Sequence, residues 1–205
     1  MTSTNKSLSA FFKDISLEIK DTKVSLGEML SRLGDRSHAF IILLASIPFL
    51  IPVTIPGFST PFGLLIIFVA VCLAFQVPPK IPKRLAAFSF GGPRASEVFR
   101  RSSVILEKIE KLAKPRGEFA FSGKFSTFVI GLTIFYAGVL LALPTPPGGN
   151  FPPAVALVLL SVGYLEHDLL FVALGVLATI ITTVLFYAII IALLYGGKAL
   201  LGAAS

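Results

Sequence analysis

Apolar runs and polar stretches alternate along the chain and divide it into segments. The two polar stretches are residues 1–36 and 78–125, and most of the remaining sequence is apolar. Within residues 7–20, and again within residues 24–33, apolar side chains recur at helical spacing with charged residues between them. This spacing predicts one or two amphipathic helices, which lie either on a bilayer or against the second polar stretch.

Several positions indicate where the helices of the polar stretches begin and end. Ser25 and Glu28 have the spacing of a capping box, and Gly34 has the position of a helix stop. In the second polar stretch, apolar residues at helical spacing predict another amphipathic helix over residues 96–112, which ends before Pro115.

Prolines break the apolar sequence into runs of unequal length. The runs at 38–51 and 62–75 are shorter than the roughly 20 residues that a helix needs to cross the hydrocarbon of a membrane. Residues 125–143 are long enough to span, and residues 154–165 are again too short. The last run, 169–195, has no charge and predicts one long membrane helix that ends before two glycines.

Two of the proline breaks resemble each other. The stretches 47–76 and 138–167 align at an offset of about 91 residues and share the pattern Pro-Gly-x-x-x-Pro. Each has the pattern of a broken-helix hairpin, which either re-enters the membrane or consists of half-length helices. The turn residues are Pro52, Pro56, Gly57 and Pro61 in the first copy, and Pro144, Pro147, Gly148 and Pro152 in the second.

The chain as a whole therefore predicts an all-α integral membrane protein. Its parts are amphipathic cytoplasmic or interfacial helices (1–36), a first broken-helix hairpin (37–77), a basic cytoplasmic loop with an amphipathic helix (78–125), a second hairpin (126–168), and a long transmembrane helix with a tail (169–205). Both hairpins return to the cytoplasm, so the two copies have parallel orientations. Because one protomer has too few helices to enclose a transport path, we expect a homodimer or a larger homo-oligomer.

Composition agrees with a membrane protein and restricts its partners. The chain is 55% hydrophobic and 14% charged, whereas a soluble domain has about 25% charged residues. It shows no pattern of a secretory signal peptide. The net charge of +7 is concentrated in residues 78–125, where Lys and Arg mark the cytoplasmic side and attract anionic lipid headgroups. Arg100, Arg101 and Lys108 are the expected contacts with lipid or a partner protein, or else a solvated surface, and no nucleic-acid partner is expected.

Glu166, His167 and Asp168 interrupt an apolar stretch and form the first candidate site. Ionisable groups beside or within a membrane are expensive and raise a functional hypothesis. A carboxylate beside a histidine suits proton transfer near neutral pH. The structural alternative is that Asp168 caps the long helix that follows it.

The two proline-rich turns form the second candidate site. Thr145 and Asn150 supply polar groups in one turn, and Thr54 supplies a hydroxyl in the other. If the turns approach each other, they form a small polar pocket for a sugar, a lipid headgroup or an ion; the alternative is a pair of tight turns. Asp35, Arg36 and His38 precede the first apolar run and form a polar lip at the cytoplasmic side, with Ser37 as a possible helix cap.

Other chemistry is not indicated. The chain has one cysteine, Cys72, and no metal-ligand spacing, nucleotide fingerprint or nucleophile motif. We therefore expect no metal, no cofactor and no enzyme activity.

Two blocks of the chain are distinctive, Leu33-Gly34-Asp35-Arg36-Ser37 and Gly149-Asn150-x-Pro-Pro153. They are the most specific parts of a resemblance that covers residues 25–195, which are similar to the ExoD family of exopolysaccharide-synthesis proteins of the bacterial inner membrane. The family continues its last block with an acidic residue and a glycine, whereas Leu169 follows Asp168 here. The resemblance implies a bacterial inner-membrane protein associated with exopolysaccharide production, and it supplies no catalytic residues to transfer. The Lys and Arg surplus adds the expectation that the N-terminus and loop 78–125 of this multi-pass protein are cytoplasmic.

Three hypotheses for the function follow. The first is a small transporter or lipid-carrier handling protein that holds its ligand between the two turns, with the acidic-histidine cluster as the coupling or gating group. The second is a non-catalytic scaffold that docks polysaccharide-synthesis proteins. The third is a membrane enzyme that acts on a lipid-linked sugar, with a carboxylate and a histidine as acid and base.

Overall fold

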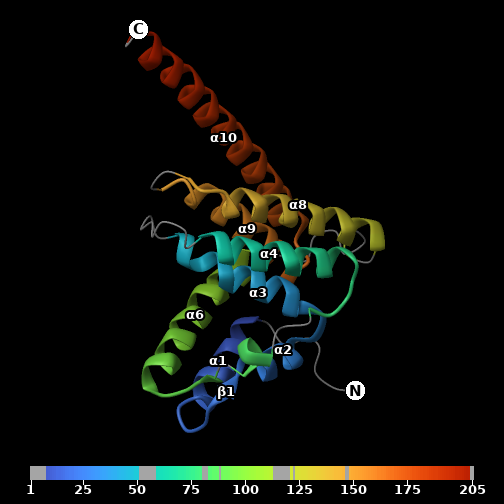
Figure 1. The fold of residues 1–205 in the computed structure, drawn as a ribbon. Coiled ribbons are helices and arrows are strands. Elements are labelled where there is room, and N and C mark those ends of the chain that lie inside the picture. The colour runs from blue at the N-terminus through green and yellow to red at the C-terminus, as the bar shows by residue number, and fades with distance from the viewer. Residues whose placement is uncertain are drawn as a thin grey trace.

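The computed structural model describes residues 8–50, 59–79, 83–87, 89–112, 121, 123–145 and 148–203. Within these ranges the chain is almost entirely helical and forms two layers, a polar layer and an apolar bundle (Figure 1). The predicted turn residues Pro52, Thr54, Pro56, Gly57 and Pro147 lie outside the described residues.

The polar layer contains the amphipathic helices that the sequence predicts. It consists of α1 (Leu8–Glu18), α2 (Leu26–Leu33), α5 (Lys83–Ala86) and α6 (Pro93–Leu112), with a two-residue antiparallel pairing of β1 (Val24–Ser25) and β2 (Ser89–Phe90). The sequence did not predict α5 or these short strands. The predicted cap is confirmed, because the Ser25 hydroxyl accepts a hydrogen bond from the Glu28 backbone N–H at 3.2 Å. Gly34 ends α2 with a φ of 56°, which favours glycine.

Helix α1 packs against α6 in the polar layer. The rings of Phe12 and Phe99 lie 5.4 Å apart, and the Ser96 hydroxyl donates to the Ser16 carbonyl at 2.6 Å. Arg32 joins α2 to α1 through two hydrogen bonds to the Glu18 carboxylate. Of the two alternatives for the N-terminal helices, the structure therefore has the one in which they pack against the second polar stretch.

The apolar bundle is built from two helical hairpins and one long helix. The first hairpin is α3 (Ser37–Ser46), the 3-10 helix η2 (Ile47–Leu50) and α4 (Ser59–Ala74), preceded by the 3-10 helix η1 (Gly34–Arg36). The second is α8 (Lys124–Ala142) and α9 (Phe151–Leu165), followed by α10 (Leu169–Ala203). Pro61 lies in the first turn of α4, and Pro152 in the first turn of α9, where a proline costs no hydrogen bond.

The predicted end of the last helix at residue 195 is wrong. Helix α10 continues through Gly196 and Gly197 to Ala203. A glycine in a helix costs about 1 kcal/mol relative to alanine, and the good helix formers that follow offset this cost.

Small residues allow the bundle helices to approach closely. A Cβ added to Gly63 would lie 2.6 Å from the Ala142 Cβ, and one added to Gly131 would lie 2.8 Å from the Ala74 Cβ. The start of α4 therefore contacts the end of α8, and the end of α4 contacts the first half of α8. The two helices are antiparallel. Gly163 and Gly175 give α9 and α10 the same kind of contact.

Helices α4 and α9 end in the same way. The Val77 N–H bonds to the Cys72 carbonyl, and the Asp168 N–H bonds to the Gly163 carbonyl, both at 2.9 Å. These six-to-one bonds belong to Schellman motifs, whose penultimate residue is left-handed. That residue is Gln76 in one helix and His167 in the other, with φ of 56° and 52°. The two residues are 91 positions apart, the offset at which the sequence stretches align.

Two of the described helices are long and apolar enough to cross a membrane. They are Lys124–Ala142 and the Leu169–Ala192 part of α10. Helices α4 and α9 are apolar but shorter, as the sequence predicts.

Candidate functional site

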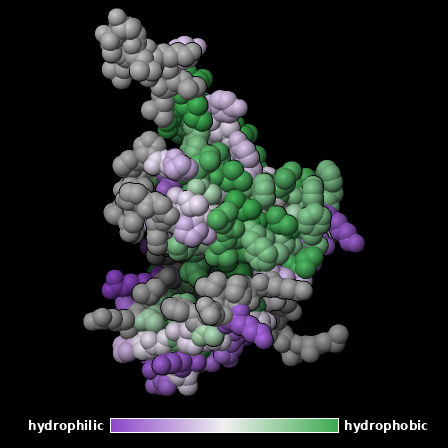
Figure 2. All heavy atoms as spheres, in the orientation of Figure 1, coloured by the Kyte–Doolittle hydropathy of each residue, from purple (hydrophilic) through white to green (hydrophobic). Residues whose placement is uncertain are grey.

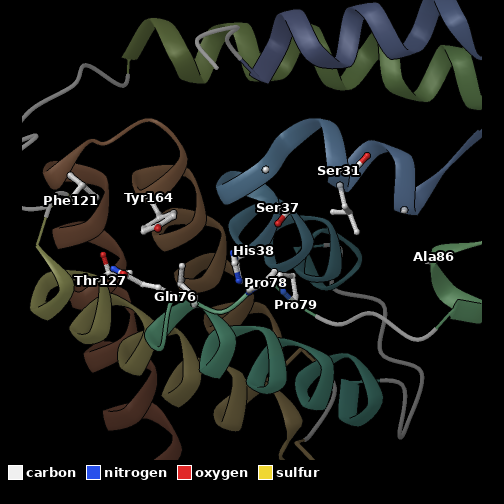
Figure 3. Close-up of a pocket in the computed structure, with 14 residues that line it drawn as sticks. Ser31, Ser37, His38, Gln76, Pro78, Pro79, Ala86, Phe121, Thr127 and Tyr164 are labelled. Atoms are coloured by element: carbon white, nitrogen blue, oxygen red, sulfur yellow. The ribbon is translucent and has the colours of Figure 1, made fainter. Parts of the chain in front are cut away.

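A pocket of about 760 Å³ lies where the polar layer meets the bundle (Figure 3). Helix α2 and the segment after it form one side, and the bundle helices form the other. Both hairpins reach this pocket with their open ends: α3 and α8 begin here, and α4 and α9 finish here. The lining residues are Gly27, Leu30, Ser31, Gly34, Ser37, His38, Leu73, Gln76, Pro78, Pro79, Ala86, Phe121, Thr127 and Tyr164.

The polar side chains of the lining are of three kinds. They comprise hydroxyls, one amide and one imidazole, and no Asp, Glu, Lys or Arg is among the lining residues that the structure describes. Figure 3 shows Gln76, Thr127, Tyr164 and Phe121 at one end of the pocket and Ser31 and Ala86 at the other, with His38 between them. This mixture of apolar walls with a few polar groups is typical of a small-molecule site.

His38 is held in the pocket wall by the end of α4. It is buried, and its Nε2 lies 2.8 Å from the Val77 carbonyl oxygen. Since a carbonyl only accepts hydrogen bonds, this Nε2 carries the proton. His38 was predicted as part of a polar lip, and the structure places it on the pocket itself. Ser37 also lines the pocket, but it is the first residue of α3 and does not cap it: the N-cap position is Arg36, which makes no side-chain cap hydrogen bond.

An aromatic group closes one end of the pocket. The His167 ring packs edge-on against Phe121 with centroids 5.2 Å apart, and it lies 6.5 Å from the Tyr164 ring. Phe121 and Tyr164 themselves are 6.3 Å apart. His167 therefore stands behind two lining residues and supports them.

Asp168 has the structural role that the sequence offered as an alternative. Its side chain is fully buried, and its carboxylate accepts a hydrogen bond from the Leu170 N–H at 2.9 Å at the start of α10. This is the geometry of a helix N-cap, where the helix dipole also favours a negative charge. Glu166 lies at the end of α9 and is partly buried.

The Thr145 and Asn150 pair lies at the opposite end of α9 from Glu166, His167 and Asp168. Helix α9 has 15 residues, a length of about 22 Å, so the structure does not bring these two candidate groups together. The Thr145 hydroxyl donates to the Asn150 side-chain oxygen at 2.8 Å, and Asn150 is buried. Pro144 lies just before this turn and Gly148, with a φ of 85°, lies within it.

The N-terminus of α9 has no free backbone donors to offer a ligand. Pro152 and Pro153 have no N–H, Phe151 N–H bonds to the Gly148 carbonyl, and Ala154 N–H bonds to the Asn150 carbonyl. A helix N-terminus binds anions through such donors. The described N–H groups in the first turn of α9 are thus bonded within the chain, whereas the open end of the hairpin lines a pocket.

The predicted contact residues of the basic stretch lie on the exposed side of α6. Arg100 and Arg101 both bind the Glu97 carboxylate at 2.7 Å. These two guanidinium groups lower the pKa of Glu97 to about 2. Lys108 is exposed. Because Glu97 pairs with both arginines, part of the positive charge on the exposed surface of α6 is neutralised within the helix.

Basic residues lie close in sequence to several lining residues. Arg36 precedes Ser37, and Lys124 precedes Thr127 by three positions at the start of α8. Lys83 has the same relation to Ala86. The side chain of Asp35, the remaining residue of the predicted lip, lies outside what the structure describes.

The sequence did not predict Ser31, Gln76, Thr127 and Tyr164 as site residues. One signal was available for Gln76, because it aligns with His167 at the offset between the two similar stretches. No cluster of three or more His, Cys, Asp or Glu that could hold a metal occurs in the described part of the chain.

Comparison with known proteins shows which family the chain resembles in sequence. The chain is 31% identical over 185 residues to the protein ExoD of Rhizobium meliloti (strain 1021), covering 89% of this chain and 77% of that protein. It is 26% identical over 188 residues to an uncharacterized protein of Synechocystis sp. (strain ATCC 27184 / PCC 6803 / Kazusa), covering 91% of this chain and 86% of that protein. No solved structure matches. The family model described as "Exopolysaccharide synthesis, ExoD" matches residues 8–188, and the chain therefore belongs to the ExoD family, which is involved in exopolysaccharide synthesis.

Proposed function

We propose that this chain is a multi-pass membrane protein that binds the saccharide-bearing headgroup of a lipid carrier during exopolysaccharide synthesis. The observation that carries the proposal is the pocket at the open ends of the two hairpins, which is lined by apolar groups, hydroxyls, an amide and an imidazole and lies at the border between the apolar bundle and the polar layer. A glycolipid has the same division, because its head needs hydrogen bonds and its tail needs an apolar surrounding.

The surface of the bundle supports a place in a membrane. Large apolar side chains are exposed on several helices, over the region that is green in Figure 2, while hydrophilic residues gather over the polar layer. An exposed apolar surface of this extent is typical of contact with lipid or protein. Among these residues are Leu64 and Phe68 on α4, Leu132 and Tyr136 on α8, and Leu177, Ile180, Ile181 and Val184 on α10.

The bilayer would then place the pocket at the level of the lipid headgroups. Because the polar layer carries the basic stretch, its side of the membrane is the cytoplasmic side of the bacterial inner membrane under this proposal. A headgroup that enters the pocket leaves its tail beside the apolar helices. Arg36 and Lys124, which precede the lining residues Ser37 and Thr127 in the sequence, have the charge that suits the phosphate linking the sugar to its carrier.

The two hairpins would form this site as two parallel copies of one unit. Leu73 and Tyr164 occupy equivalent positions at the 91-residue offset, and both line the pocket. Arg36 and Thr127 are also equivalent, and they lie beside or on it. Repeats related by an axis along the membrane normal occur in transporters, where the binding site lies between the copies.

Direct binding tests the proposal. The protein is placed in lipid nanodiscs, and its affinity for a long-chain polyprenyl diphosphate that carries a sugar is measured. Tyr164→Ala removes one wall of the pocket and should weaken binding about tenfold or more. The matched control is Tyr187→Ala, because Tyr187 is 65% exposed on α10 and is not among the residues that line this pocket.

Two results would contradict the proposal. The first is a wild-type protein that does not bind the glycolipid above the level of empty nanodiscs. The second is an equal loss of affinity in the Tyr164 and Tyr187 variants. Either would favour the non-catalytic scaffold, whose contacts would lie on the polar layer.

A further inference from the structure

Two residues of the chain adopt a backbone conformation that their side chains disfavour. Gln76 and His167 have φ of 56° and 52°, and they are the non-glycine residues with positive φ in the described part of the chain. Glycine adopts this conformation without strain and is the usual residue at this position of a Schellman motif. Replacement of either residue by glycine would therefore relieve the backbone strain at its position.

Both strained residues stand at the same pocket. The Gln76 side chain lines it. His167 packs on Phe121 and Tyr164, which line the same end. Strain that collects at one site in this way points to a function of the side chains that cause it.

The chemistry of Gln76 identifies a kind of ligand. A glutamine amide donates through its nitrogen and accepts through its oxygen, so it pairs with groups that do both. Sugar hydroxyls donate and accept, whereas a phosphate oxygen only accepts. Thr127 adds a hydroxyl at the same end of the pocket (Figure 3).

We infer that Gln76 contacts the saccharide of the ligand, and that His167 positions Phe121 and Tyr164 as the wall against which the sugar lies. This inference rests on the proposed function and deepens it, because it assigns the sugar to the Gln76 end of the pocket. The chain retains two strained helix ends for this purpose.

Replacement by glycine separates stability from recognition. Gln76→Gly removes the strain and the amide together, so it should raise the Tm by about 2–4 °C while lowering the affinity for the sugar-bearing carrier about tenfold. His167→Gly loses its ring contacts as well, so its Tm changes less, and the affinity for the same carrier also falls. A purely structural residue would not give a more stable protein that binds less well.

A second probe shows which part of the ligand is contacted. The same polyprenyl diphosphate without a sugar should bind the wild type and both glycine variants equally. The control variant is Gly92→Ala, which adds strain at a φ of 92° where no atom lies within 4 Å and which is outside the pocket. It should lower the Tm and leave both affinities unchanged.

The outcomes distinguish this inference from the proposed function. If the wild type binds the sugar-bearing carrier and Gln76→Gly binds it equally well, the assignment of Gln76 is wrong while the pocket stands. If the glycine variants weaken both probes to the same degree, they alter the pocket in general and saccharide recognition by Gln76 is wrong. A lower Tm for Gln76→Gly would show that the strain argument is wrong, whether or not either probe binds.

Discussion

The turn end of the second hairpin, between α8 and α9, differs from the open end of both hairpins in how its described polar groups are used. At the turn end, Thr145 and Asn150 bond to each other, and prolines remove the donors that α9 would otherwise expose. At the open end, hydroxyls, an amide and an imidazole surround a pocket. The comparison teaches that a proline-rich break in an apolar sequence can close a helix end instead of forming a binding site.

Substitutions at the close contacts between α4 and α8 should give the largest change in stability. These two helices contact each other both near the turn end and near the pocket end. Gly63 contacts Ala142 near the turns, and Gly131 contacts Ala74 near the pocket. Gly63→Leu places a side chain where even a Cβ would lie 2.6 Å from Ala142. We expect a loss of about 3 kcal/mol or more in the free energy of unfolding, since overpacking of this kind usually costs about 1–3 kcal/mol.

The measurement is chemical denaturation in detergent micelles, with Gly123→Ala as the control, because its added Cβ would lie no closer than 3.5 Å to another atom. Equal stability of Gly63→Leu and the control would mean that α4 and α8 do not pack as described. A Gly131→Leu variant should be destabilised comparably and should also disturb the pocket.

Removal of the bond at the turn end gives an intermediate effect. Asn150→Ala removes a buried amide and leaves the half-buried Thr145 hydroxyl without its acceptor, so we expect a loss of about 1–3 kcal/mol in the free energy of unfolding. Binding of the sugar-bearing carrier by the folded protein should stay at the wild-type level, because this turn is about 22 Å from the pocket end of α9. A tenfold loss of affinity without loss of stability would instead place the ligand at the turns.

The ion pairs of the polar layer give the smallest effect. Hydrogen bonds from Arg32 lower the pKa of Glu18 below its usual 4.5. A carboxylate with a lowered pKa stabilises the fold above the unfolded value, and this stabilisation is lost as the pH falls from 4.5 through the lowered pKa. Both side chains are 38% exposed, so we expect at most about 0.5 kcal/mol.

Glu18→Gln checks this last effect. The difference in unfolding free energy between it and the wild type should be present at pH 7 and vanish at low pH. A difference that grows as the pH falls would have the wrong sign for this ion pair.

Much of the fold follows from local signals in the sequence. The Ser25 cap, the Gly34 stop and the Asp168 cap each depend on a few adjacent residues, and the structure has all three. Helix α8 follows from the length of its apolar run, and the start of α9 follows from the prolines in its first turn. These features can be predicted without knowing which helices pack against each other.

The pocket depends on contacts between distant segments, so the sequence could not predict it. Ser31, Gln76, Thr127 and Tyr164 come from four helices or helix ends, and none carries a motif of its own. The sequence pattern emphasised the turns because prolines and glycines are conspicuous there. The left-handed φ of Gln76 and His167 becomes visible only in the structure.

The corner between α9 and α10 has a mechanical consequence. The two helices are separated by three residues, and the Asp168 backbone and side chain bond to both of them. Helix α10 has 35 residues and thus acts as an arm about 52 Å long. A tilt of about 5° at this corner, beside the pocket, displaces the far tip by about 4–5 Å over that length.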